Sequence, residues 1–288
     1  MNLLKALSVP CPFLNEMKPR SSIMPWSATR KVSPQLRHCC RAIIASTILF
    51  CGAAAHVAAN AAEVLTAGSP PTSAPMTFLD VKTQTIEGVM PDLIREIGKR
   101  EGFTVQFEAI PFAALIQSAV SGKIDIIVSA MTPNPKRAQV VDFADIIYAY
   151  GEGMVVPDDD KTAYTSAQDL KGQVIGAPAG TDYGEALQKL GIFKEVKYYD
   201  SPADMIKDLQ NGRIKAAFND YPELKAVAAK GGLPGMHVVE SYKPLSTAGV
   251  AIAVRKGNKP LLDKINAGIA QMKQDGTLAA ILNKWGLH

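Results

Sequence analysis

Two short polar clusters in this chain have the composition of a small-molecule binding site. One cluster, SAMT at 129–132, follows the largely apolar run 124–128, and the other, Asn219 with Asp220, follows 214–218. We predict both runs to be buried strands, and open α/β sheets bind ligands beyond the carboxyl ends of their strands. We therefore expect the two clusters to line one cleft.

The clusters belong to an internal repeat. SGKI at 121–124 and NGRI at 211–214 lie 90 residues apart, and each ends a predicted helix and begins a predicted strand. A chance match of a few residues is the alternative. The matched context on both sides favours two lobes of similar design.

Charge is distributed unevenly along the chain, which carries 31 Lys and Arg against 27 Asp and Glu. Seven basic residues, one acidic residue and all four cysteines precede Ala62, so the remainder has a formal charge of −2 and no thiol. Nucleic-acid binding needs a basic face, so we expect no nucleic acid as a partner. The remainder has no HExxH or GxSxG sequence and only two histidines, His237 and His288. We therefore expect no catalytic residue, no metal and no cofactor.

The first 61 residues have the pattern of an export signal. A basic stretch at 30–41 precedes an apolar run at 42–55, and ANA at 59–61 has the small-x-small pattern of a cleavage site. The apolar run is shorter than the ~20 residues of a membrane span, and no later run is longer. We predict that 1–61 is a signal peptide and that the mature protein is periplasmic. Met17 or Met24 is an alternative start, and lipidation of Cys51 is a less favoured alternative to cleavage.

Short apolar runs alternate with amphipathic segments after the signal, as in parallel sheets whose strands are connected through helices. Pro91 and Gly102 delimit one such helix. We predict strands at 63–67, 104–109, 124–128, 173–177, 195–199 and 214–218, and helices at 91–102, 112–122, 182–191, 202–212 and 259–285, the last divided near Gly276.

Several stretches, in this order and spacing, resemble the polar amino-acid-binding proteins of bacterial ABC importers, which are solute-binding proteins of family 3 typified by histidine- and glutamine-binding proteins. The resemblance covers 64–285. It is carried by GVMPDL at 88–93, PFAALI at 111–116, SGKID at 121–125, MT at 131–132 with KR at 136–137, VDF at 141–143, LKG at 170–172, GT at 180–181, AFND at 217–220, GT at 276–277 and KWG at 284–286.

The resemblance implies a type II periplasmic-binding-protein fold of the α/β class, with two lobes that each contain a mostly parallel sheet flanked by helices. The first lobe is expected at 62–154, the second at 155–246, and 247–288 returns to the first lobe and adds the C-terminal helices. Two hinge strands are expected near 151–156 and 247–254.

The resemblance also implies a site for an amino-acid zwitterion. Arg137 and the backbone of Thr132 would bind the carboxylate from the first lobe, because a guanidinium donates two parallel hydrogen bonds to a carboxylate. Thr181 and Asp182 would approach it from a helix start in the second lobe. Without the resemblance, Arg137 would be interpreted as a solvated helix arginine.

Asp220 and the carbonyl of Ala130 would accept hydrogen bonds from the ligand's ammonium, and Phe112 would pack against the ligand's side chain. Two local interpretations compete: Asp220 as a helix N-cap before Tyr221, and Phe112 as a core residue.

The pocket for the ligand's side chain departs from the family pattern. Ser73 stands where members commonly carry an aromatic residue, and Met90 and Ala113 stand where members commonly carry acids. Fewer acids argue against a lysine- or arginine-like ligand, whereas Asp182 could pair with a cationic side chain or could only compensate the helix dipole. Tyr183 is a further candidate side-chain contact, with packing as the alternative.

The function implied is that of the extracytoplasmic binding component of an ABC importer. The expected partners are an amino-acid-like small molecule and a membrane permease, and the protein is expected to be a monomer. A secreted enzyme on the same scaffold, similar to cyclohexadienyl or arogenate dehydratase, is the alternative, because fold does not separate the two.

Overall fold

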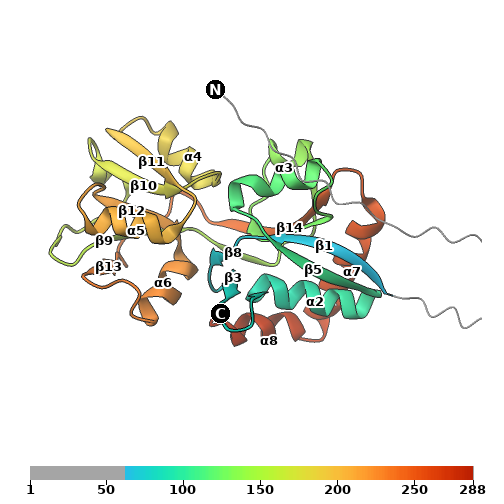
Figure 1. The fold of residues 1–288 in the computed structure, drawn as a ribbon. Helices are drawn as coiled ribbons and strands as arrows, with labels where there is room; N and C mark the ends of the chain where they lie inside the picture. The colour runs from blue at the N-terminus through green and yellow to red at the C-terminus, as the bar shows by residue number, and fades with distance from the viewer. Residues whose placement is uncertain (1–61, 288) are drawn as a thin grey trace, which may run out of the picture. The chain divides into compact units, whose positions relative to one another are not determined.

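The computed structural model describes residues 62–287. The predicted signal peptide and Cys51 lie outside the described residues. Two sheets dominate the described part of the chain (Figure 1), and each is covered by helices on both faces. No helix among residues 62–287 is long and apolar enough to cross a membrane.

The first lobe is the six-stranded sheet with the helices packed on it. Its strands are β5 (Phe103–Ala109), β1 (Glu63–Ser69), β6 (Ile126–Met131), β14 (Ala248–Arg255) and β7 (Val141–Phe143), in that order, with β8 (Tyr148–Tyr150) also paired to β14. Strand β1 is parallel to β5 and β6, whereas β14 is antiparallel to its partners. The helices are α2 (Val89–Glu101), η2 (Phe112–Ala114), α3 (Leu115–Val120), η3 (Arg137–Gln139), α7 (Lys259–Gln274) and α8 (Thr277–Lys284).

The second lobe is the five-stranded sheet with its helices. Its strands are β11 (Glu195–Tyr199), β10 (Val174–Pro178), β12 (Ala216–Asp220), β9 (Glu152–Pro157) and β13 (Met236–Val238), in that order. Strand β10 is parallel to β11 and β12, and β9 is antiparallel to β12 and β13. The helices are η4 (Ala167–Leu170), α4 (Asp182–Lys189), α5 (Pro202–Gln210) and α6 (Tyr221–Ala229). Both sheets therefore contain three parallel strands with an antiparallel strand beside them, and this shared arrangement agrees with the two similar lobes that the internal repeat predicts.

A small antiparallel sheet, absent from the sequence prediction, precedes α2. It contains β2 (Thr72–Ser73), β3 (Thr77–Asp80) and β4 (Thr85–Glu87). Strands β3 and β4 pack against α2, which attaches this sheet to the first lobe.

The cores explain why consecutive apolar residues form strands. Side chains alternate between the two faces of a strand, so a run of apolar residues is stable only where helices cover both faces. Ile126 and Val128 pack with α2 and α7 on one face of the first sheet, while Ile127 packs with α3 on the other. In the second sheet, Phe218 and Ala217 divide between two clusters in the same way.

The chain passes between the lobes twice. Gly151 connects β8 of the first sheet to β9 of the second, and the segment 239–247 leads back from β13 to β14. A Cβ placed on Gly151 would lie 2.5 Å from Cβ of Pro244 and 2.8 Å from the carbonyl oxygen of Ser246. The two crossing segments therefore touch at this glycine, where no larger residue fits without displacing the backbone.

The predicted strands that precede the two polar clusters end later in the structure than expected. Strand β6 continues to Met131 because β14 pairs with that residue, and β12 continues to Asp220 because β9 pairs with both of its last residues. Most of each polar cluster therefore forms the end of a strand rather than the loop beyond it. The tail divides as predicted into α7 and α8 at Gly276.

Candidate functional site

A cavity of about 220 Å³ lies between the two lobes. The carboxyl ends of all six parallel strands contribute to its walls. From the first lobe these ends supply Pro70, Pro111 and Thr132, and from the second Pro178, Asp200 and Asp220. The cavity thus forms where open α/β sheets bind ligands. It is smaller than the ~300–1,000 Å³ of drug-sized sites, so it suits a small solute.

The structure brings all nine predicted site residues to this cavity. They share no single element and span both lobes. They are Ser73, Phe112, Ala130, Thr132, Arg137, Thr181, Asp182, Tyr183 and Asp220.

Arg137 is 7% exposed and lies in the short helix η3. Its backbone N–H donates to Oδ1 of Asn134 at 2.7 Å, which fixes the turn that carries it. Nη1 donates to the carbonyl of Thr132 at 2.6 Å and Nη2 to the carbonyl of Gly180 at 2.8 Å. Burial lowers the pKa of the guanidinium, and the charge of Asp182 opposes this effect.

Asp182, in the second lobe, forms an ion pair with Arg137, in the first lobe. Its Oδ2 accepts from Nη1 of Arg137 at 3.2 Å and its Oδ1 from the side-chain amide of Asn134 at 2.7 Å. The guanidinium of Arg137 has five N–H donors. Three of them are used, by the carbonyls of Thr132 and Gly180 and by Oδ2 of Asp182. Nε and one Nη2 proton have no acceptor among the described residues, so two donors remain for a carboxylate ligand.

Thr181 caps helix α4. Its hydroxyl accepts from the backbone N–H of Gly184 at 3.2 Å and donates to the carbonyl of Pro178 at 2.9 Å. Because the hydroxyl is occupied, what α4 offers to the cavity is its start, where backbone N–H groups and the helix dipole favour an anion.

Asp220 is at the N-cap position of α6, yet its side chain makes no cap hydrogen bond. Instead Oδ2 accepts from the hydroxyl of Tyr150 at 2.8 Å. Burial raises the pKa of Asp220 to about 6, the hydrogen bond from Tyr150 acts in the opposite direction, and the charge of Glu152 raises the pKa further. Asp220 therefore directs an acceptor into the cavity, as the zwitterion model requires.

The remaining predicted residues form the walls. The Phe112 ring lies 5.7 Å from the Arg137 guanidinium carbon, so it packs over the cation as well as facing the cavity. Tyr183 donates to Oδ1 of Asn219 at 3.3 Å. Met90, by contrast, is fully buried in the core of the first lobe.

Sequence reasoning missed Glu152 and Glu223. Glu152 begins β9 next to Gly151, and its Oε1 accepts from the hydroxyl of Tyr242 and the backbone N–H of Leu245, at 2.7 and 2.6 Å. Its second oxygen is buried with no hydrogen-bond partner among the described residues, and burial raises its pKa. Glu223 lies in the first turn of α6, where an acid is ordinarily interpreted as a compensator of the helix dipole, so no sequence signal marks it.

The cavity is more acidic than the sequence suggested. Among the described residues that line it, Arg137 is the single cation, and the acids are Glu152, Asp182, Asp200, Asp220 and Glu223. Met90 and Ala113 supply no acid, but acids from the second lobe and the hinge line this pocket, so the absence of acids at those two positions does not make the cavity unsuited to a cationic side chain. No group of three or more His, Cys, Asp or Glu among residues 62–287 is placed to hold a metal ion.

The family model for bacterial extracellular solute-binding proteins, family 3, matches residues 65–288. The chain belongs to this family. The resemblance and the two-lobed α/β fold predicted from the sequence are thereby confirmed, and the solved structures below agree with both.

Two amino-acid-binding proteins are similar to this chain over most of their length. The ABC transporter arginine-binding protein 1 of Escherichia coli (strain K12) is 30% identical over 228 residues, which cover 79% of this chain and 92% of the relative. The histidine-binding periplasmic protein of Salmonella typhimurium (strain LT2) is 30% identical over 257 residues, which cover 85% of this chain and 95% of the relative.

Two solved structures extend the comparison. An ancestral arginine-binding protein bound to arginine superposes with a TM-score of 0.71 at 32% identity, covering 77% of this chain and 98% of the other. An ancestral amino-acid-binding protein described as a precursor of cyclohexadienyl dehydratase superposes with a TM-score of 0.69 at 28% identity, covering 77% and 95%.

Proposed function

We propose that this protein binds an amino acid or amino-acid derivative between its lobes and presents it to the membrane permease of an ABC importer. The observation that carries the proposal is the placement of Arg137 and Asp220 in one cavity, on different lobes. Arg137 offers two free donors to a carboxylate, and Asp220 offers an acceptor to an ammonium. An amino-acid zwitterion carries both groups on one carbon, so a single ligand would join the lobes.

The relatives support the transport role. One is named as an arginine-binding protein of an ABC transporter, and the other as a histidine-binding periplasmic protein. We therefore propose a monomeric binding protein rather than an enzyme, located in the periplasm after removal of 1–61. The boundary expected between 154 and 155 moves to 151, because β9 (Glu152–Pro157) pairs in the second sheet, so the first lobe contains 62–151 and 247–288 and the second contains 152–246. N-terminal sequencing of the exported protein tests the cleavage site, and light scattering tests the monomer.

The enzyme alternative has its own readout. A dehydratase would consume prephenate or arogenate, whereas a binding protein would not turn over either compound. If the protein at micromolar concentration converts either compound, and still does so after it has been purified a second time, the proposal of a binding protein would be contradicted.

A thermal-shift panel of amino acids tests the binding function. A ligand that binds only the folded protein, at ~100 times its Kd, adds ~2.7 kcal/mol to the free energy of unfolding. At least one amino acid should raise the melting temperature, and its amide and its decarboxylated amine should not, because each lacks the carboxylate for Arg137. Equal shifts from the amide would mean that the carboxylate site is wrongly assigned.

A further inference from the structure

Glu223 is a buried acid of the cavity that the zwitterion model does not use. It is 4% exposed, and its Oε2 accepts from the side-chain amide of Asn219 at 3.0 Å. Ser73, in the small sheet of the first lobe, lines the same cavity. No Lys or Arg among residues 62–287 forms an ion pair with it, although a buried carboxylate without a cation is costly.

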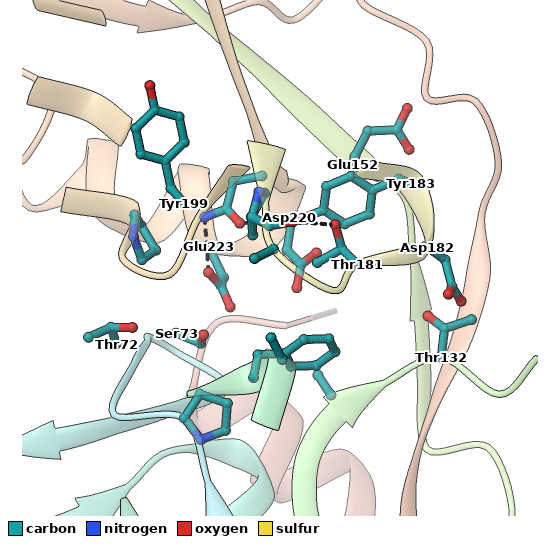
Figure 2. Close-up of a pocket in the computed structure, with 18 of the residues that line it drawn as sticks. Thr72, Ser73, Thr132, Glu152, Thr181, Asp182, Tyr183, Tyr199, Asp220 and Glu223 are labelled. Carbon is teal, nitrogen blue, oxygen red and sulfur yellow. Dashed lines mark hydrogen bonds between the residues drawn. The ribbon is translucent and has the colours of Figure 1, made fainter. Parts of the chain in front are cut away.

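The position of Glu223 separates it from the carboxylate end of the cavity. Figure 2 shows Glu223 and Ser73 on one side of Asp220, and Thr132 and Asp182 on the other. Arg137 is hydrogen-bonded to the latter two residues, so it belongs to that side. A zwitterion held between Arg137 and Asp220 would therefore extend its side chain toward Glu223.

Three acids of the cavity, Glu152, Asp200 and Glu223, have no cationic partner among the described residues. Asp200 is exposed to solvent, and Glu152 lies at the hinge, where its Oε1 accepts from Tyr242 and Leu245, so Glu223 is the buried acid on the side-chain end of the cavity. Arg137 takes the ligand's carboxylate and Asp220 its ammonium, while Asp182 is already paired with Arg137. A ligand with an uncharged side chain would leave Glu223 buried beside Asp220 without a cation. A second cationic group on the ligand would balance it, and the hydrogen bond from Asn219 already holds the carboxyl group in place.

We propose that Glu223 is the specificity-determining residue that pairs with a cationic group on the side chain of the bound amino acid. This inference rests on the proposed function and assigns its ligand class: amino acids with a second amine, a guanidinium or a similar cation. Burial and the neighbouring charge of Asp220 raise the pKa of Glu223, as expected for a carboxyl group that lacks this counterion.

Calorimetric titration with matched ligand pairs tests the proposal. Arginine and citrulline, lysine and norleucine, and ornithine and norvaline have similar shapes within each pair and differ in the side-chain cation. The wild-type protein should bind the cationic member of at least one pair about tenfold or more tightly than its neutral partner. In Glu223→Gln, which keeps an acceptor for Asn219, that preference should fall to about threefold or less.

Asp204→Asn is the control, because Asp204 is an exposed acid in the first turn of α5 in the same lobe and does not line the cavity. It removes the same charge from the second lobe, so a preference created only by the general negative potential of that lobe would decrease in both variants. We expect Asp204→Asn to keep the wild-type preference. An unchanged preference in folded Glu223→Gln, or an equal loss in Asp204→Asn, would overturn the assignment.

The wild-type titrations separate this inference from the proposed function and do not depend on the folding of any variant. If only neutral members bind, or both members bind equally, the assignment of Glu223 is wrong while amino-acid binding stands. If no amino acid binds in either the titrations or the thermal-shift panel, the proposed function itself is wrong.

Discussion

The guanidinium of Arg137 and the carboxylate of Asp182 form an ion pair, 3.2 Å from nitrogen to oxygen, that connects the two lobes directly. The side chain of Arg137 is 8% exposed and that of Asp182 33% exposed, so the pair lies at the rim of the cavity rather than in free solvent. Oδ2 of Asp182 accepts one of the guanidinium N–H groups of Arg137, at the end of the cavity where the ligand's carboxylate is proposed to bind. This contact therefore both holds the lobes together and orients the residue proposed to bind the ligand.

Asp182→Asn should weaken closure in the absence of ligand. The variant removes the charge that pairs with Arg137 while an amide can still contact Asn134, so the closed arrangement loses its interlobe ion pair. Small-angle scattering of the unliganded variant should give a larger radius of gyration than that of the wild type, and saturating ligand should contract both proteins to the same radius. An identical unliganded radius would mean that other contacts control closure.

Arg137→Ala should remove detectable ligand binding. Leaving a buried carboxylate without its cation costs ~3–5 kcal/mol, which corresponds to more than about a hundredfold in Kd. Arg137→Lys should recover only part of this loss, because an ammonium cannot donate the planar pair of hydrogen bonds. Titration calorimetry on variants verified as folded by circular dichroism is the measurement.

Lys136→Ala is the control for Arg137. Lys136 also pairs across the lobes, with Glu185 at 3.4 Å, but its side chain is 81% exposed. Such a surface pair contributes ~0–1 kcal/mol, so Lys136→Ala should bind almost as tightly as the wild type. Wild-type affinity in Arg137→Ala, or equal losses in the two variants, would refute the carboxylate assignment.

Gly180→Ala should oppose closure through shape alone. Gly180 has a φ of +77°, and a Cβ placed on it would lie 3.1 Å from Cα and 3.2 Å from Cβ of Ala113 in the opposite lobe. Gly172 has a φ of +76° with no atom within 4 Å of such a Cβ, so it is a matched control. Each alanine costs roughly 1–2 kcal/mol of stability for its left-handed backbone. Only Gly180→Ala should also weaken ligand affinity, by about tenfold or ~1.4 kcal/mol, as measured by titration calorimetry. Equal ligand affinities in Gly180→Ala and Gly172→Ala would show that the lobes can separate slightly without loss of binding.

Ligand affinity should depend on pH through Asp220. The ammonium needs the ionised carboxylate, and with a pKa of about 6 Asp220 is mostly protonated at pH 5. The Kd should therefore be about tenfold higher at pH 5 than at pH 7. Tyr150→Phe should move the midpoint to higher pH, because it removes a hydrogen bond that favours the ionised form. A flat profile between pH 5 and pH 7 would argue that Asp220 does not bind the ammonium.

The unliganded protein should show the converse dependence of stability. Because the pKa of Asp220 is raised on folding from 3.8 to about 6, the folded state binds this proton more tightly than the unfolded state. The protonated carboxyl group of Asp220 therefore stabilises the folded state at low pH, and this contribution to the free energy of unfolding is lost as the pH rises from about 4 through about 6. Asp220→Asn should reduce this slope in urea titrations, and an identical slope in both proteins would place the pKa of Asp220 near its ordinary value.

The sequence alone determined the family and the six parallel strands with most of the helices that connect them, but not the small sheet β2–β4, the short strands β7, β8 and β13, or helix α6. Local hydrophobic periodicity, prolines and glycines decide where a helix or strand begins, which is why the strand predicted at 195–199 coincides with β11 and the tail divides at Gly276. The polar residues at the carboxyl ends of the parallel strands could also be predicted, because strand direction places those ends at one edge of a sheet.

The tertiary structure decided which of these residues act together. Asp182 and Glu223 both lie in the first turn of a helix, and in sequence both have the pattern of acids that compensate a helix dipole. Only the approach of the lobes pairs Asp182 with Arg137 and buries Glu223 beside Asp220 and Ser73. Burial and ion pairing depend on contacts between segments that are distant along the chain, and no local pattern of residues records those contacts.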